Sequence, residues 1–427
     1  MTARETQLVQ IEKPVYGGAF LARVEGKAVF VPLTLPGEQA RVRMVEEKRG
    51  YALAETEQIV IASAARITPG CQHFGACGGC HYQHTDYESQ LGFKQAILHE
   101  TLERGGLRTL PAIAVCAAQP WGYRNRIRLA LDAAGNPGYR GRRSHSVIPV
   151  KECPIAAPIL VYAAVTLAAT LRETISTLRP SEISLFCSAD ENTLLASIFV
   201  ASPGKSSLDD LARTFQERIP ELRGLELIVE GRKSQPPRTL ARWGSSSLAY
   251  RAAGFDYRVD HGSFFQVNRW LVDELVARVT AGRSGRLAWD LFAGVGLFAR
   301  QLTASFEHVI AVESAPSAID ALKENLRNTR GEAVQSDTLA FLRRQPPSIA
   351  PDLIVVDPPR TGLGSETTAQ LARLASPAIV YVSCDPATLA RDLGALLSSG
   401  YAIESITLVD LFPQTFHLET VVALRRA

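Results

Sequence analysis

The chain has 427 residues, of which 46% are hydrophobic and 21% charged, and its formal net charge is +3. This composition excludes a disordered chain, a collagen-like chain and a small disulfide scaffold. At roughly 100–200 residues per domain, the length predicts about two to four domains. The polar N-terminus and the lack of any apolar run of about 18 residues predict a cytoplasmic protein with no membrane partner.

Residues 1–66 are expected to form a small β-barrel. Apolar and polar residues alternate in Gln7–Ile11, Ala28–Pro32 and Ala40–Val45, and glycine-containing turns separate these stretches. Short strands with even turn spacing are typical of barrels of the OB type, many of which bind single-stranded nucleic acid. A barrel that serves only as a spacer is the alternative.

Residues 67–261 mix both kinds of secondary structure and are expected to form an α+β central domain. Helical periodicity covers 86–105 and 157–177, whereas 127–131, 183–186 and 194–200 are predicted strands.

Residues 262–427 show strands that alternate with helices, which predicts a doubly wound parallel sheet of Rossmann-like form. The predicted strands are 287–292, 308–312, 352–356, 378–382, 405–408 and 420–424. Ligands bind at the carboxyl ends of the strands in such sheets. The side chains that follow these strands are therefore the first candidates for a site.

A glycine-containing turn follows the first of these strands, in the stretch 290–298. Gly294 and Gly296 permit a tight turn and a close approach to a ligand, but the full dinucleotide and phosphate-loop patterns are missing. Glu313 ends the next strand and is placed to accept both hydroxyls of a ribose. Asp337 follows the third strand and could accept from an adenine amino group. A nucleoside ligand without phosphates fits best, which indicates S-adenosylmethionine.

Three further polar residues lie at predicted strand ends. Asp357 closes the fourth strand, in a loop that two prolines stiffen. Cys384 follows the fifth strand and precedes a helix that starts at Pro386, so the helix dipole is expected to favour a nucleophilic thiolate. Glu419 precedes the last strand and is the candidate base. A buried packing cysteine and a surface carboxylate are the alternative interpretations.

Four cysteines form a candidate metal site. Cys71, Cys77 and Cys80 lie close together and Cys153 is remote, a layout that favours an iron–sulfur cluster over zinc. Three nearby histidines keep zinc as an alternative: His73, His81 and His84. Because methyl transfer needs no redox step, a structural role is expected.

A basic stretch with interleaved aromatic residues lies between Trp121 and Lys151, and it holds a single acidic residue. Its basic members are Arg124, Arg126, Arg128, Arg140, Arg142, Arg143 and Lys151. Arginine with aromatic residues is typical of single-stranded RNA binding, and a solvated strand face is the alternative.

Together these motifs resemble the RNA uracil-C5 methyltransferases over nearly the whole chain. The resemblance rests on the cysteine set, Asp357-Pro-Pro-Arg360, the stretch 383–392 and His417-x-Glu419, and residues 28–38 resemble the TRAM domain. It implies a class I methyltransferase domain, a [4Fe-4S] cluster on the four cysteines, Cys384 as nucleophile and Glu419 as proton acceptor. It further implies that S-adenosylmethionine is bound by Gln266, Phe292, Glu313, Asp337 and Asp357.

The resemblance also implies the substrate. Thiolate addition at uracil C6 makes C5 nucleophilic towards a methyl donor, and a base then removes the C5 proton. 23S ribosomal RNA is the expected substrate, the T-loop of tRNA is the alternative, and no obligate protein partner is evident. A non-catalytic RNA-binding iron–sulfur protein is the rival of another class. The chain departs from the family pattern at Asp385 and Leu297, where asparagine is usual.

Overall fold

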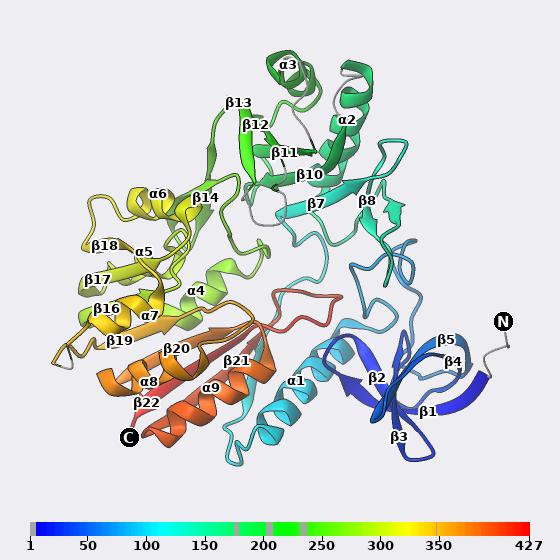
Figure 1. Cartoon of the computed structure of the whole chain (residues 1–427), viewed down its shortest axis with the longest axis horizontal. Coiled ribbons are helices and arrows are strands. Elements are labelled where there is room, and N and C mark those ends of the chain that lie inside the picture. Colours follow the sequence, from blue (N-terminus) through cyan, green and yellow to red (C-terminus); the bar gives the residue numbers. More distant parts are fainter. Residues whose placement is uncertain (1–5, 175–178, 202–207, 230, 232–236, 347) are drawn as a thin grey trace.

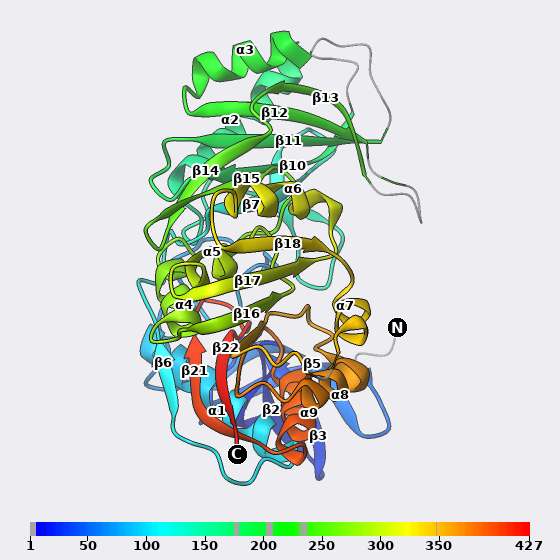
Figure 2. The same ribbon diagram turned by 90° about the vertical axis from the view of Figure 1, so that its left-hand side faces the viewer.

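The computed structural model describes residues 6–174, 179–201, 208–229, 231, 237–346 and 348–427. Figure 1 shows an N-terminal barrel, an upper lobe built around a central sheet, and a C-terminal sheet, with helix α1 (Tyr87–Arg104) between the C-terminal part and the barrel. Among the described helices, none is long and apolar enough to cross a membrane. Figure 2 shows the central and C-terminal sheets stacked along the long axis of the molecule.

The barrel closes in the strand order β1-β2-β3-β5-β4, which confirms the predicted OB-like fold. Alternate residues such as Val9, Ile11 and Val31 point inward and are almost completely buried. The chain leaves the barrel beside buried Glu38, whose carboxylate binds the Arg66 guanidinium at 2.6 Å. The strands are β1 Thr6–Val15, β2 Ala19–Val24, β3 Lys27–Pro32, β4 Gln39–Glu47 and β5 Tyr51–Ile61.

The central lobe is the predicted α+β unit, with the strand order β13-β12-β11-β10-β7-β8-β9. Every residue of β11 is buried, and helices α2 and α3 pack together over the sheet. The elements are β7 Arg126–Leu131, β8 Pro137–Arg140, β9 Val147–Pro149, α2 Pro158–Thr174, β10 Pro180–Cys187, β11 Leu194–Val200, α3 Leu208–Arg218, β12 Leu222–Val229 and β13 Arg238–Gly244. The last residues of the predicted helix 157–177 lie outside the described residues.

The C-terminal sheet has the order β18-β17-β16-β19-β20-β22-β21-β6, and β16 to β20 run parallel as predicted. Helices α4 to α6 cover one face, and α1, α7, α8 and α9 cover the other. The elements are α4 Val272–Thr280, β16 Gly285–Leu291, α5 Leu297–Leu302, β17 Phe306–Glu313, α6 Pro316–Asn325, β18 Gly331–Gln335, α7 Thr338–Arg344, β19 Leu353–Val356, α8 Gly364–Leu374, β20 Ala378–Ser383, α9 Pro386–Ser398, β21 Tyr401–Val409 and β22 Thr420–Arg426.

Two elements from the segment predicted as central belong to this sheet. Strand β6 (Ile113–Cys116) pairs in parallel with β21, and helix α1 (Tyr87–Arg104) packs against α9. The sequence analysis did not predict β6, because four residues are too few to show a periodic pattern. The C-terminal sheet is thus completed by chain that precedes the central sheet.

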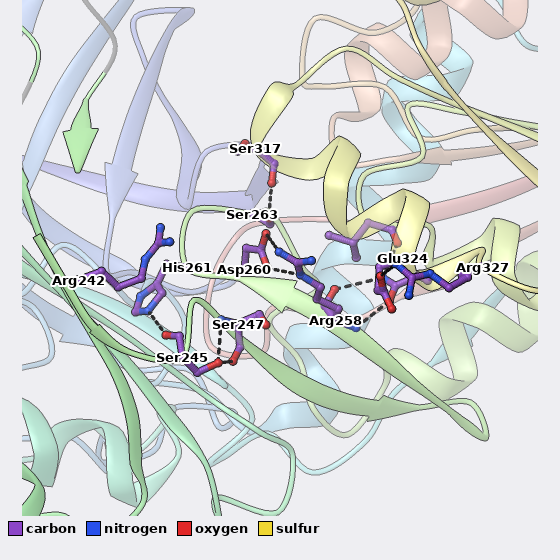
Figure 3. A network of polar contacts seen from close by, with 12 residues as sticks. Arg242, Ser245, Ser247, Arg258, Asp260, His261, Ser263, Ser317, Glu324 and Arg327 are labelled. Carbon is purple, nitrogen blue, oxygen red and sulfur yellow. Dashed lines mark hydrogen bonds and ion pairs between the residues drawn. The ribbon is translucent and has the colours of Figure 1, made fainter. Parts of the chain in front are cut away.

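A hairpin joins the two large sheets and leads into the segment 261–268. Its strands are β14 (Ser247–Ala252) and β15 (Phe255–Asp260). The Ser263 hydroxyl donates to the Ser317 carbonyl at 2.8 Å, and His261 contacts the Ser245 carbonyl at 3.3 Å, as Figure 3 shows. These contacts fix both ends of the turn that precedes Gln266.

Candidate active site

Five of the predicted site residues lie at one edge of the C-terminal sheet. Phe292 follows β16, Glu313 ends β17, and Asp337 lies just beyond β18. Asp357 follows β19 and Cys384 follows β20. Because β16 to β20 are parallel, these positions share the carboxyl edge, where open α/β sheets bind ligands.

Strand pairing places Glu419 opposite Cys384. Strand β22 runs antiparallel to β20, and Ser383 pairs with Thr420 at the end of the ladder. The next residues outward are Cys384 on one strand and Glu419 on the other. A candidate nucleophile and a candidate base therefore meet at the carboxyl edge of the sheet.

The surroundings of Cys384 oppose the thiolate that the sequence predicts. Burial, together with the nearby carboxylates of Glu419 and Asp357, raises the pKa of the thiol to about 12. Asp385 is the N-cap of α9, and its Oδ1 accepts from the amides of Ala387 at 3.0 Å and Thr388 at 2.9 Å. Asp385 thus caps two amides of the first turn of α9, while burial and the two carboxyl groups oppose the thiolate that the sequence predicts for Cys384.

The two carboxyl groups beside Cys384 are themselves perturbed. Burial raises the pKa of Asp357 to about 7. Glu419 is 4% exposed, and burial and the Asp357 charge raise its pKa well above the usual range, against a lowering effect of Arg360. A carboxyl group with a raised pKa is a stronger base once it is ionised, which favours proton transfer in general acid–base catalysis.

Removing the Glu419 charge is expected to make Cys384 more reactive towards iodoacetamide. The ionised carboxylate raises the thiol pKa, so Glu419→Gln lowers that pKa and raises the thiolate fraction wherever Glu419 would otherwise be ionised. Alkylation of the Cys384 peptide is followed by mass spectrometry from about pH 7 to pH 10, and it is expected to be about three- to tenfold faster at the alkaline end, where the raised Glu419 pKa allows ionisation. The matched control is Glu404→Gln, which removes a surface carboxylate paired with Arg425. Equal alkylation rates in the unaltered protein, Glu419→Gln and Glu404→Gln would contradict the assigned electrostatic effect.

A small pocket lies between the glycine turn and the segment 261–268. Gln266, Phe292 and Asp357 all line it, and it encloses about 30 Å³. Phe292 has a φ of 67°, a strained conformation for an aromatic residue that is often found at functional sites. Phe264, at the same pocket, is 67% exposed. The structure thus brings together three of the five residues predicted to bind the cofactor.

The other two predicted cofactor residues lie outside this pocket. The Glu313 carboxylate accepts from the amides of Gly294 at 2.8 Å and Ala315 at 2.6 Å, which ties the glycine turn to β17. Asp337 is exposed, and it caps α7 by accepting from the Ala340 amide at 3.0 Å. Leu297, one of the two departures, is 7% exposed in the same pocket lining, where it fills apolar space.

The barrel supplies a residue to the site that the sequence analysis missed. The Tyr16 hydroxyl donates to the Cys384 carbonyl at 3.4 Å, and its ring packs edge-on against Phe416 at 5.5 Å. No local motif marks Tyr16, because its partners lie in a different domain. The glycines that follow it, Gly17 and Gly18, are its only sequence signal, since they mark a turn.

The four predicted metal-binding cysteines line one cavity of about 370 Å³. All four are free thiols, and burial raises the pKa of Cys77, Cys80 and Cys153. No three His, Cys, Asp or Glu side chains among the described residues are close enough together to bind a single metal ion. The four thiols thus line a single cavity.

Two of the three nearby histidines also border the cysteine cavity. His73 and His81 line it, and each has a buried ring nitrogen without a hydrogen-bond partner. His84 does not line it, and its Nε2 contacts the Thr34 carbonyl at 3.0 Å. Phe416 and His417 form part of the cavity wall, so the loop that ends at Glu419 separates this cavity from Cys384.

The basic stretch divides between two surface grooves. Arg124, Arg126 and Arg128 line a groove of about 450 Å³ on the central sheet, together with Tyr139 and Phe199. A second groove of about 480 Å³ runs between the barrel and the central lobe, and Tyr139 borders both grooves. Its lining includes Gly17, Gly18, Arg140, Arg142 and Arg143. Arginine thus lines a path from the central sheet to the barrel turn beside Tyr16.

Comparison with known proteins gives matches over nearly the whole chain. A family model described as tRNA (uracil-5-)-methyltransferase matches residues 347–427, and a TRAM domain model matches residues 2–56. A structure of Pyrococcus abyssi tRNA (uracil-54, C5)-methyltransferase in complex with S-adenosyl-L-homocysteine has a TM-score of 0.78 and 24% identity. The match covers 98% of this chain and 100% of that one, which confirms the fold.

Relatives of similar length also match this chain in amino-acid sequence. An RNA methyltransferase of Thermotoga maritima is 32% identical, with 97% of this chain and 98% of the relative covered. The 23S rRNA (uracil(1939)-C(5))-methyltransferase of Chromohalobacter salexigens is also 32% identical, over 98% of this chain and 89% of the relative. On this identity and coverage, the chain belongs to the family of RNA uracil-C5 methyltransferases.

Proposed function

We propose that the protein transfers a methyl group from S-adenosylmethionine to C5 of one uridine in 23S ribosomal RNA. The observation that carries the proposal is the pairing of Ser383 with Thr420, which sets Cys384 opposite Glu419 at the ligand-binding edge of the sheet. Full-length similarity to 23S ribosomal RNA methyltransferases supports the substrate. The T-loop uridine of tRNA is the second candidate, supported by the fold shared with the Pyrococcus enzyme.

In the proposed reaction, the Cys384 thiol gives up its proton to solvent water and the resulting thiolate sulfur adds to uracil C6, which leaves the negative charge on the uracil ring. This addition makes C5 electron-rich, and C5 takes the methyl group from the sulfonium of the donor, which leaves as S-adenosylhomocysteine. Glu419 then accepts the proton from C5. The C5–C6 double bond re-forms as the bond to Cys384 breaks, so the thiolate is regenerated and the product is 5-methyluridine.

The donor is proposed to lie along the carboxyl edge of β16 to β19. Gln266, Phe292 and Asp357 would contact it in their shared pocket, and it would extend beyond the enclosed 30 Å³ towards Glu313 and Asp337. A Cβ added at Gly294 meets no atom within 4 Å, so the turn leaves open space for a ligand. The donor supplies the electrophilic methyl group, and the protein positions it.

RNA is proposed to follow the two arginine-lined grooves of the barrel and the central lobe towards the catalytic domain at the C-terminal sheet. The uracil atoms C5 and C6 are shielded in a stacked helix, so the target base must be turned out to reach Cys384. Guanidinium groups bind phosphates, and aromatic side chains stack on unpaired bases.

Mapping of 5-methyluridine in cellular RNA tests the proposed substrate. A strain that lacks this protein is expected to lose one 5-methyluridine from 23S ribosomal RNA and to keep the 5-methyluridine of its tRNA. Mass spectrometry of RNase fragments measures both, and restoring the gene is the control. Loss of the tRNA modification with intact ribosomal RNA would favour the second candidate.

The four cysteines are proposed to hold a [4Fe-4S] cluster with a structural role. Thiolates are soft ligands that suit iron–sulfur clusters. A cluster places iron and sulfide between its ligands, and four thiols that line one cavity of about 370 Å³ fit this arrangement. The chemistry of methyl transfer does not pass through the cluster.

Anaerobic purification is expected to yield about four iron and four sulfide per chain, with an absorption band lost on oxidation. Cys153→Ser is expected to lose most of the iron, because it removes the one ligand outside the 71–80 segment. Cys187→Ser, at a buried cysteine of the central sheet, is the control and is expected to keep it. One zinc per chain without sulfide would contradict the cluster.

A further inference from the structure

The loop between β21 and β22 carries the candidate base at its far end. It begins at Asp410 and ends at Glu419. Where the two ends of the loop meet, the Val409 amide donates to the Glu419 carbonyl at 2.8 Å. Its two ends therefore lie side by side. Any group that fixes the first residue of the loop also restrains the last.

Lys94 of helix α1 binds the start of this loop. Its Nζ donates to Asp410 Oδ1 at 2.5 Å and to the Phe412 carbonyl at 2.9 Å. The side chains of Lys94 and Asp410 are both 0% exposed. The Tyr87 hydroxyl donates to the other Asp410 oxygen at 2.9 Å. Both carboxylate oxygens are thus held by one helix.

The same helix also holds the middle of the loop. Gln90 donates through its Nε2 to the Gln414 side chain and accepts from the Gln414 amide, both at 3.0 Å. Gln414 has a φ of 67°, a conformation that needs such support. Tyr87, Gln90 and Lys94 are three and four residues apart, so they share one face of α1.

A fully buried ion pair is a costly way to stabilise a fold. Burial lowers the pKa of Lys94, and the Asp410 charge offsets this effect. Apolar residues of similar volume often stabilise as well or better, so a buried pair that persists is better explained by fixing one conformation. Here the conformation that it fixes is that of the loop ending at Glu419.

We propose that Lys94 is a positioning residue for removal of the C5 proton: its buried contact with Asp410 holds the 410–419 loop so that Glu419 faces Cys384. This inference rests on the proposed function. If it is correct, loss of Lys94 slows the step that needs Glu419 and leaves the earlier addition and methyl transfer less affected.

The test is Lys94→Met, which keeps a long unbranched side chain and removes its charge. Turnover on the RNA substrate is expected to fall about 10- to 100-fold, as for a small misplacement of a catalytic group, with little change in KM for RNA. The methylated RNA is expected to accumulate as a covalent adduct with the enzyme, visible as a shifted, methyl-labelled band on denaturing gels. A purely structural role would lower the amount of active enzyme without accumulating the adduct.

Two further variants keep the outcome decisive. Tyr87→Phe removes one hydrogen bond to Asp410, and it is expected to give a weaker form of the same result if Lys94→Met does not fold. Glu100→Gln is the matched control, because it breaks an ion pair of the same helix with Lys13 of the barrel. Its turnover is expected to stay normal, without adduct.

Normal turnover in the folded Lys94→Met enzyme would overturn the inference, and so would a loss of turnover without the covalent enzyme–RNA adduct. In the Tyr87→Phe enzyme, normal turnover or reduced turnover without adduct would likewise overturn the inference. Failure of the proposed function looks different, because the unaltered enzyme would then form no 5-methyluridine in any RNA.

Discussion

Replacing Cys384 with alanine is expected to abolish 5-methyluridine formation, with turnover lowered by about 10⁴-fold or more. Uracil C5 is too weak a nucleophile to attack a sulfonium methyl group unless a thiolate first adds at C6. Alanine removes that addition and leaves the neighbouring carboxyl groups in place. Neither Glu419 nor Asp357 can replace the sulfur, because burial favours their neutral forms and a neutral carboxylic acid is a poor nucleophile.

The measurement is transfer of a labelled methyl group to an RNA fragment, together with separate binding assays for RNA and S-adenosylmethionine. Binding of both is expected to survive in Cys384→Ala, because the residues proposed to bind them lie elsewhere. Cys116→Ala is the control, since that buried cysteine carries no proposed role. Methylation that persists in Cys384→Ala would exclude the covalent mechanism.

The strand-end residues of the catalytic domain could be predicted from the sequence for a physical reason. In a parallel sheet, the end of each buried strand is visible as the end of an apolar run, and all such ends share one edge. Glu313, Asp357 and Cys384 were therefore placed correctly relative to the sheet. The closed barrel was predicted in the same way, from local alternation and turns.

Contacts between distant parts of the chain could not be predicted. Lys94 and Asp410 are 316 positions apart, and Tyr16 and Cys384 are 368 apart. No local pattern encodes such pairs, because each residue looks ordinary in its own segment. The Cys384 thiol illustrates the same limit: the sequence shows only the helix that follows it, whereas burial, and then the carboxyl groups of Glu419 and Asp357 from other parts of the sheet, raise its pKa.

Replacing Glu419 with glutamine is expected to separate methyl transfer from product release. Glutamine has the same shape but cannot take up the C5 proton, so the methylated uracil stays bonded to Cys384. Turnover is expected to fall about 10²- to 10⁴-fold, the usual contribution of a general base. A single round of methyl transfer is still expected, seen as a labelled enzyme–RNA band that resists denaturation.

The Glu419→Gln experiment also distinguishes between two candidate bases, Glu419 and Asp357. Asp357 also lies beside Cys384, and its pKa of about 7 suits a base equally well. If Asp357 removed the proton, Glu419→Gln would turn over without accumulating adduct, and Asp357→Asn would accumulate it. Because Asp357 also lines the donor pocket, Asp357→Asn is expected instead to weaken donor binding and to form little adduct.

The Glu404→Gln enzyme, altered at a distant surface carboxylate, gives the turnover and the amount of adduct expected for an unrelated charge change. Adduct in Glu419→Gln alone would assign proton removal to the residue that strand pairing sets opposite the nucleophile.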